Sequence, residues 1–117
     1  MFFPGLQDQV YIATGATDMR KSINGLSIMV AEQLTLNPLS GHLFCFCNRK
    51  RDMVKILYWD RNGFCIWHKR LEKDRFRWPE NTADVIDLEG RELSWLLEGL
   101  DLGHSPAHGR VSYASVV

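Results

Sequence analysis

The fold is decided by residues 53–71, which read MVKILYWDRNGFCIWHKRL. Two apolar runs, Met53–Trp59 and Phe64–Leu71, are rich in β-branched and aromatic residues, which favour strands. They flank Asp60-Arg-Asn-Gly63, and Asn-Gly between two such runs is the strongest short signal of a β-hairpin. A loop over residues 60–63 would pair Trp59 with Phe64, whereas a tighter Asn62-Gly63 turn would pair Trp59 with Ile66. Both registers predict the same assignment of side chains to the two faces of the hairpin.

Neither face of this hairpin is polar, although an antiparallel sheet with one solvated face should show a polar one. The second face must therefore be covered by a helix, or it offers its aromatic side chains to a partner. Alternation places Val54, Ile56, Tyr58, Cys65, Trp67, Lys69 and Leu71 on the first face, and Lys55, Leu57, Trp59, Phe64, Ile66, His68 and Arg70 on the second.

The chain before the hairpin predicts a strand, a helix and a second strand. Gln9–Thr14 is a short run of β-formers that ends at Gly15. Asp18 occupies the position of a helix N-cap, and Asn37-Pro38 stops the helix near Leu36. The apolar stripe of this helix is Met19, Ile23, Leu26, Val30 and Leu34, and the strand that follows it is His42–Cys47.

Beyond the hairpin, the sequence predicts a brief strand at Arg75–Trp78, another at Val85–Leu88 and a second helix at Glu89–Leu100. The order is β-α-β-β-β-β(β)-α, in which the bracketed strand is Val85–Leu88. Consecutive strands with short links favour antiparallel pairing, so we expect an α+β fold in which two helices pack on a mainly antiparallel sheet of about five strands. Residues 1–102 should form a single domain, and residues 103–117 a loose C-terminal tail.

The composition is that of a folded protein, since 45% of the 117 residues are hydrophobic and 24% are charged. No apolar run approaches the roughly 18 residues of a membrane span. The start, Met1–Gly5, lacks the basic and long apolar regions of a signal peptide. We therefore expect a cytoplasmic protein, and an odd number of cysteines fits that compartment.

Charge is segregated along the chain although the net charge is zero. Residues 49–77 hold ten Lys or Arg and four acids, whereas residues 80–101 hold seven acids and one Arg. A local excess of this size attracts polyanions, so we interpret it as a DNA-binding surface, with a solvated rim as the alternative. The candidate DNA-binding residues are Arg20, Lys21, Arg49, Lys50, Arg51, Lys55, Lys69, Arg70, Arg75 and Arg77, and the candidates for stacking or partner contact are Tyr58, Trp59 and Trp67.

Three catalytic or metal-binding patterns are incomplete. Residues 15–22 resemble a phosphate loop, but Arg20 replaces its second glycine, which leaves at most a phosphate anchor at a helix start. Cys45 and Cys47 have a spacing that is poor for zinc, so we expect free thiols. Asp84 and Asp87 are expected to be solvated charges. We predict no catalytic residue, no metal and no cofactor.

Several motifs, in order and at plausible spacing, resemble one known family. These are residues 11–22 (YIATGATDMRKS), 40–46 (SGHLFCF), 55–63 (KILYWDRNG), 69–72 (KRLE) and 96–101 (LLEGLD), with Phe76 and Trp78-Pro79. Together they are similar to the small second-reading-frame protein, of the TnpB type, of the bacterial insertion-sequence-sixty-six transposon family. The resemblance covers roughly residues 5–102.

This resemblance implies an accessory protein that is needed for transposition and is encoded beside a separate transposase. It implies no known activity, and no catalytic residues carry over. The leading hypothesis is a non-catalytic accessory protein that binds DNA through its basic surface. The alternative is an adaptor that docks on the transposase, or on a second copy, through the apolar hairpin face.

Overall fold

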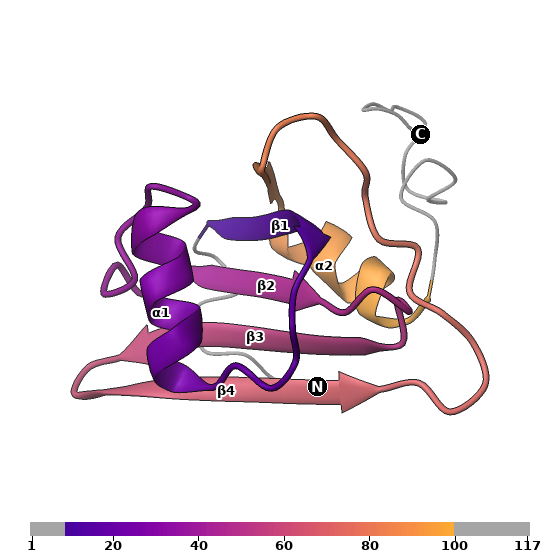
Figure 1. Ribbon diagram of the computed structural model, residues 1–117, viewed down its shortest axis with the longest axis horizontal. Helices are drawn as coiled ribbons and strands as arrows, with labels where there is room; N and C mark the ends of the chain where they lie inside the picture. The colour runs from indigo at the N-terminus through magenta and orange to yellow at the C-terminus, as the bar shows by residue number, and fades with distance from the viewer. Residues whose placement is uncertain (1–8, 100–117) are drawn as a thin grey trace.

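A computed structural model describes residues 9–99 of the chain, as a five-stranded sheet with one helix on each face (Figure 1). The strand order across the sheet is β4-β3-β2-β1-β5. The elements are β1 (Val10–Ala16), α1 (Ile23–Glu32), β2 (Leu43–Cys47), β3 (Met53–Asp60), β4 (Gly63–Arg70), β5 (Val85–Leu88) and α2 (Gly90–Leu97).

The sheet is mixed, with one parallel pair. β1 and β2 run parallel because α1 carries the chain back across the sheet between them, and every other neighbouring pair is antiparallel. The predicted α+β class with a mainly antiparallel sheet is therefore confirmed. The hairpin over residues 53–71 is also confirmed, in the register that pairs Trp59 with Phe64 and Asp60 with Gly63.

Both faces of the sheet are covered, which explains why neither face of the hairpin is polar. On one face, Leu93, Leu96 and Leu97 of α2 pack against Ile12, Cys45 and Ile56. On the other face, Leu26 and Val30 of α1 pack with Phe44, Phe46 and Leu57. Figure 1 shows α1 in front of the sheet and α2 behind it. Of the two explanations for the apolar second face, the structure therefore supports cover by a helix.

The first helix begins later and ends earlier than predicted. Its N-cap is Ser22 and not Asp18, and it ends at Glu32 and not near Leu36. Asp18 instead accepts a hydrogen bond from the backbone N–H of Arg20 at 2.9 Å, which makes a turn before the helix. Leu34 is still buried, so the apolar stripe extends past the end of the helix.

The strand predicted at Arg75–Trp78 is wrong, because this segment joins no sheet edge. It belongs to the long connection from β4, at one edge of the sheet, to β5 at the other (Figure 1). Phe76 and Trp78 are buried with the α2 side of the core, and the Trp78 indole donates to the Ala13 carbonyl at 2.9 Å. The segment is therefore held by its buried aromatic side chains and not by backbone pairing.

The last two elements agree with the sequence. β5 is the predicted strand, and α2 begins after Glu89, whose backbone N–H donates to the Glu92 carboxylate at 2.9 Å. Leu100, the predicted end of this helix, and the tail over residues 103–117 lie outside the described residues. Within residues 9–99, neither helix is long and apolar enough to cross a membrane.

Candidate nucleic-acid interface

Three segments that are far apart in the sequence meet at one end of the sheet. β1 and β2 are parallel, so their carboxyl ends lie together, and β3 begins and β4 ends at the same side. Residues 16–21, 48–52 and 70–77 adjoin these strand ends. In Figure 1 the last two segments lie at the right-hand end of the sheet, and the first runs from there across the front of the sheet to α1. We call these three segments the basic end.

The basic end concentrates positive charge, with nine Lys or Arg against four acids. Most of these cations are not committed to the fold. Among residues 9–99, six of them have side-chain nitrogens that no hydrogen bond or ion pair joins to another residue, namely Lys21, Arg49, Lys50, Lys73, Arg75 and Arg77. All except Lys73 were predicted from the sequence as DNA-binding residues.

Two predicted DNA-binding lysines instead hold the fold together. The Lys55 ammonium donates to the carbonyls of Met19 and Lys21, at 2.8 and 2.9 Å, and so ties β3 to the loop before α1. The Lys69 ammonium donates to the Leu97 carbonyl at 2.9 Å, at the carboxyl end of α2. These bonds satisfy backbone acceptors, so both side chains are less available for a ligand.

Three predicted arginines of the basic end also have partners. Arg20 forms an exposed ion pair with Asp18 at 2.7 Å, and this hydrogen-bonded pair lowers the pKa of Asp18 to about 2. Arg70 pairs with Glu72 at 3.2 Å on the surface, an interaction that solvent weakens. Arg51 is half-buried and donates to the Thr14 carbonyl at 3.3 Å.

The turn between β2 and β3 is rigidly built, and it presents Arg49 and Lys50 to solvent. The Asn48 side-chain oxygen accepts from the backbone N–H groups of Asp52 and Met53, at 3.0 and 3.1 Å. The Asn48 amide nitrogen donates to the Asp52 carboxylate at 2.7 Å. A turn that is fixed in this way loses little entropy when its exposed side chains bind a ligand.

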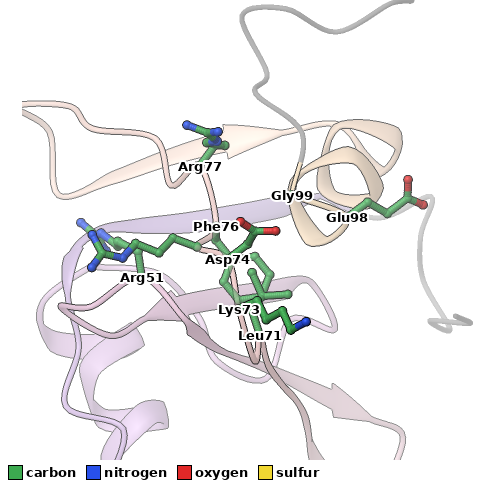
Figure 2. A pocket seen from close by; sticks show the side chains of 9 residues that line it. Arg51, Leu71, Lys73, Asp74, Phe76, Arg77, Glu98 and Gly99 are labelled. Atoms are coloured by element: carbon green, nitrogen blue, oxygen red, sulfur yellow. The ribbon is translucent and has the colours of Figure 1, made fainter.

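Two hollows flank this turn. The first, of about 610 Å³, lies on the α2 side, and Figure 2 shows the side chains that line it. Leu71 and Phe76 give it an apolar part, while Arg51, Lys73, Arg75, Arg77, Asp74, Glu98 and Gly99 complete the lining. The second, of about 650 Å³, lies between the residues that follow β1 and those that follow β2.

The three candidate stacking residues have packing contacts in the structure. Tyr58 and Trp67 pack against the α2 side of the core. Trp59 lies on the α1 side and contacts Phe64 edge to face, with ring centroids 5.1 Å apart. Burial raises the pKa of Tyr58. Stacking of these rings on nucleic-acid bases therefore stays a prediction.

Two cysteines and two acids belong to the incomplete metal-binding and catalytic patterns of the sequence. Cys45 and Cys47 are buried free thiols, as expected, and burial raises the pKa of Cys47 to about 11 and that of Cys45 further. Asp84 and Asp87 are exposed. In the described part of the chain, no three His, Cys, Asp or Glu side chains are grouped so that they could hold a metal ion.

Sequence reasoning missed two residues of the basic end. Lys73 lines the first hollow and was counted only as part of the charged run. Thr17 lines the second hollow, and its buried hydroxyl has no hydrogen-bond partner in the structure. No sequence signal marks Thr17, because its burial depends on the parallel pairing of β1 with β2.

Fold and surface together define a small protein with a mixed sheet, one helix on each face, and a preformed cationic end. The family described as "IS66 Orf2 like protein" matches residues 8–107, and the chain belongs to this family. The resemblance found in the sequence motifs is thereby confirmed. The family gives the chain an accessory role in the transposition of a bacterial insertion sequence.

Two proteins of Sinorhizobium fredii (strain NBRC 101917 / NGR234) are similar over nearly their whole length. The uncharacterized protein y4hO is 42% identical over 100 residues, which cover 86% of this chain and 87% of that protein. The uncharacterized protein y4jC is 31% identical over 101 residues, which cover 86% of each chain. No solved structure matches the chain.

Proposed function

We propose that this chain is a non-catalytic accessory protein that binds DNA through phosphate contacts from its basic end. The observation that carries the proposal is the group of six cations without partners among the described residues, gathered from three segments onto one end of the sheet. By contrast, Lys55 and Lys69 are engaged by backbone carbonyls of the fold. Cations that the fold leaves unengaged are available to neutralise phosphates and release counterions.

The test is binding of the purified protein to a labelled transposon-end duplex and to single strands, by fluorescence anisotropy across a salt series. Affinity for B-DNA should fall with salt, with a slope of about −0.9 per neutralised phosphate. Arg49→Gln should make the slope shallower by about one. No binding at low salt, to either form of DNA, would overturn the proposal.

The chain offers a matched control at the opposite end of the sheet. Arg61 is also an exposed arginine in a hairpin turn, the one between β3 and β4. Arg61→Gln removes the same charge and should leave both the affinity and the salt slope unchanged. If both substitutions weaken binding equally, the DNA contacts are not confined to the basic end.

The non-catalytic part of the proposal has its own test. Three of the four acids of the basic end already have partners, Asp18 with Arg20, Asp52 with Asn48 and Glu72 with Arg70. Within residues 9–99, no three His, Cys, Asp or Glu side chains are grouped so that they could hold a metal ion. The duplex should therefore stay intact when it is incubated with the protein and Mg²⁺ or Mn²⁺. Metal-dependent cleavage that disappears in Asp84→Asn or Asp87→Asn would show a nuclease instead.

An adaptor role is the second candidate, and exposed apolar side chains on the α1 side favour it. Ile28 on the outer surface of α1 is 54% exposed, and Leu39 in the following loop is 53% exposed. The cognate transposase should then co-purify with the protein from nuclease-treated lysate, and Ile28→Asp should reduce its recovery. Recovery that is unchanged by Ile28→Asp would exclude this surface as the interface.

A further inference from the structure

The second hollow of the basic end lies where β1 and β2 end side by side, and we call it the β1–β2 hollow. Its lining comes from the residues after β1 (Ala16, Thr17, Asp18, Met19), from the turn after β2 (Asn48, Arg49, Lys50, Asp52, Met53) and from Arg70 at the end of β4. A crevice beyond the carboxyl ends of strands is where α/β sheets commonly bind their ligands.

One polar group in this lining has no partner. Thr17 is only 4% exposed, and its Oγ1 makes no hydrogen bond to any residue in the range 9–99. The residue itself is held in place, because its backbone N–H donates to the Cys47 carbonyl at 2.8 Å. Most buried hydroxyls in folded proteins are hydrogen-bonded, so this exception calls for an acceptor or donor that the described residues do not supply.

The charges around Thr17 indicate that the missing group is an anion. Arg49 and Lys50 contribute two unengaged cations to the lining, and Arg70 adds a third, whose ion pair with Glu72 is exposed and weakened by solvent. Of the two acids in the lining, Asp18 is compensated by Arg20, whereas Asp52 accepts from the neutral Asn48 amide and keeps its charge, so the cations still outnumber the uncompensated acid. A phosphate group fits this arrangement because its oxygens accept hydrogen bonds from a hydroxyl and from guanidinium groups at the same time.

We propose that the β1–β2 hollow binds one phosphate group of a nucleic-acid backbone, with Thr17 Oγ1 donating to a phosphate oxygen and Arg49, Lys50 and Arg70 supplying the charge. This inference rests on the proposed DNA-binding function and names one anchoring point within it. The rigid turn at Asn48–Asp52 keeps Arg49 and Lys50 at the mouth of the hollow before the ligand arrives. The remaining cations of the basic end then contact neighbouring phosphates.

The decisive variant is Thr17→Val, which keeps the shape of the side chain and removes the hydroxyl. It should lower DNA affinity by about tenfold, the usual loss for a hydrogen bond to a charged group. The salt slope should stay unchanged, because a hydroxyl releases no counterion. If Thr17 acted only by positioning the cations, Thr17→Val would change the salt slope. The salt slope therefore separates a direct contact from a structural role.

Thr14→Val is the matched control. Thr14 is also buried, at 7% exposure, but its hydroxyl already donates to the Ala83 carbonyl at 2.6 Å. Thr14→Val should therefore lower the melting temperature without changing the salt slope or the affinity of the folded protein. Thr17→Val should leave the melting temperature of the free protein unchanged or raise it, because it removes an unsatisfied group.

The source of the phosphate is distinguished by NMR on the ¹⁵N-labelled full chain, titrated with a short duplex and separately with inorganic phosphate at matched ionic strength. If the NMR signals of the Thr17 and Arg49 amides shift with the duplex but not with inorganic phosphate, a phosphate of the DNA backbone occupies the hollow. Shifts with inorganic phosphate and no DNA binding would keep the phosphate site while the proposed DNA function fails.

Two results would overturn the inference. If the duplex binds, Thr17→Val binds as tightly as the parent and the Thr17 amide does not shift, then DNA contacts the basic end elsewhere and the proposed function alone survives. If neither the duplex nor inorganic phosphate moves these amides or binds, the hollow is not a phosphate site and the proposed function falls with it.

Discussion

Trp78→Phe tests how the connection between β4 and β5 is anchored. The Trp78 side chain is 6% exposed, and its indole N–H donates to the Ala13 carbonyl at 2.9 Å, across the core from β1. Losing this buried hydrogen bond costs about 1 kcal/mol. The smaller ring leaves unfilled volume, which adds about another 1 kcal/mol. We therefore expect the free energy of unfolding to fall by about 2 kcal/mol.

Trp59→Phe is the matched control, since it makes the same change of ring at a half-buried position where the indole donates no hydrogen bond to a described residue. It should cost less than about 1 kcal/mol. Urea unfolding should be followed by far-UV circular dichroism, because both variants remove a fluorescent tryptophan. The anchoring would be refuted if the two variants lost equal free energy of unfolding. It would also be refuted if the Trp78 indole proton exchanged with solvent as fast as that of Trp59.

Three further predictions concern stability. Lys55→Met should cost about 1–3 kcal/mol in urea unfolding, because the carbonyls of Met19 and Lys21 lose a charged donor. Gly99→Ala should cost about 1 kcal/mol in thermal unfolding, since Gly99 has φ +87° and a Cβ is strained there. The Cys47 thiol has its pKa raised by burial to about 11, so it stabilises the folded state below its ordinary pKa of 9.0, and this contribution is lost as pH rises from 9 to 11. Stability should fall by roughly 2–3 kcal/mol more over that range in the parent than in Cys47→Ala.

Local sequence rules predicted the hairpin well because the signals that fix it are local. Strand alternation and the Asp60–Gly63 turn lie within 19 residues of one another, so no distant contact is needed to set the register. The brief strand predicted at Arg75–Trp78 does not form, but its side chains do alternate, since Phe76 and Trp78 are buried while Arg75 and Arg77 are exposed. Alternation could not show that residues 75–78 pair with neither edge strand of the sheet, because the identity of the edge strands depends on the topology of the whole sheet.

The start of α1 was mispredicted because a distant contact overrides the local preference. Asp18 is a good N-cap residue by type, but the Lys55 ammonium of β3 holds the carbonyls of Met19 and Lys21 in a non-helical loop. Asp18 is then engaged by Arg20. The candidate site has the same origin: Thr17 and Arg49 lie 32 positions apart and line the same hollow because β1 and β2 are parallel.

The zero net charge of the chain does not conflict with a DNA-binding role, because charge is arranged along the strands. Asp60, Asp87, Glu89 and Glu92 lie at the end of the sheet opposite the basic end. The eight residues of β3 separate the two ends by about 26 Å, which is about three Debye lengths in physiological salt. DNA at the basic end is therefore screened from these acids and responds to the local excess of positive charge. If the six unengaged cations each neutralise one phosphate, the salt slope should be about −5, and a steeper slope would require cations from outside the basic end.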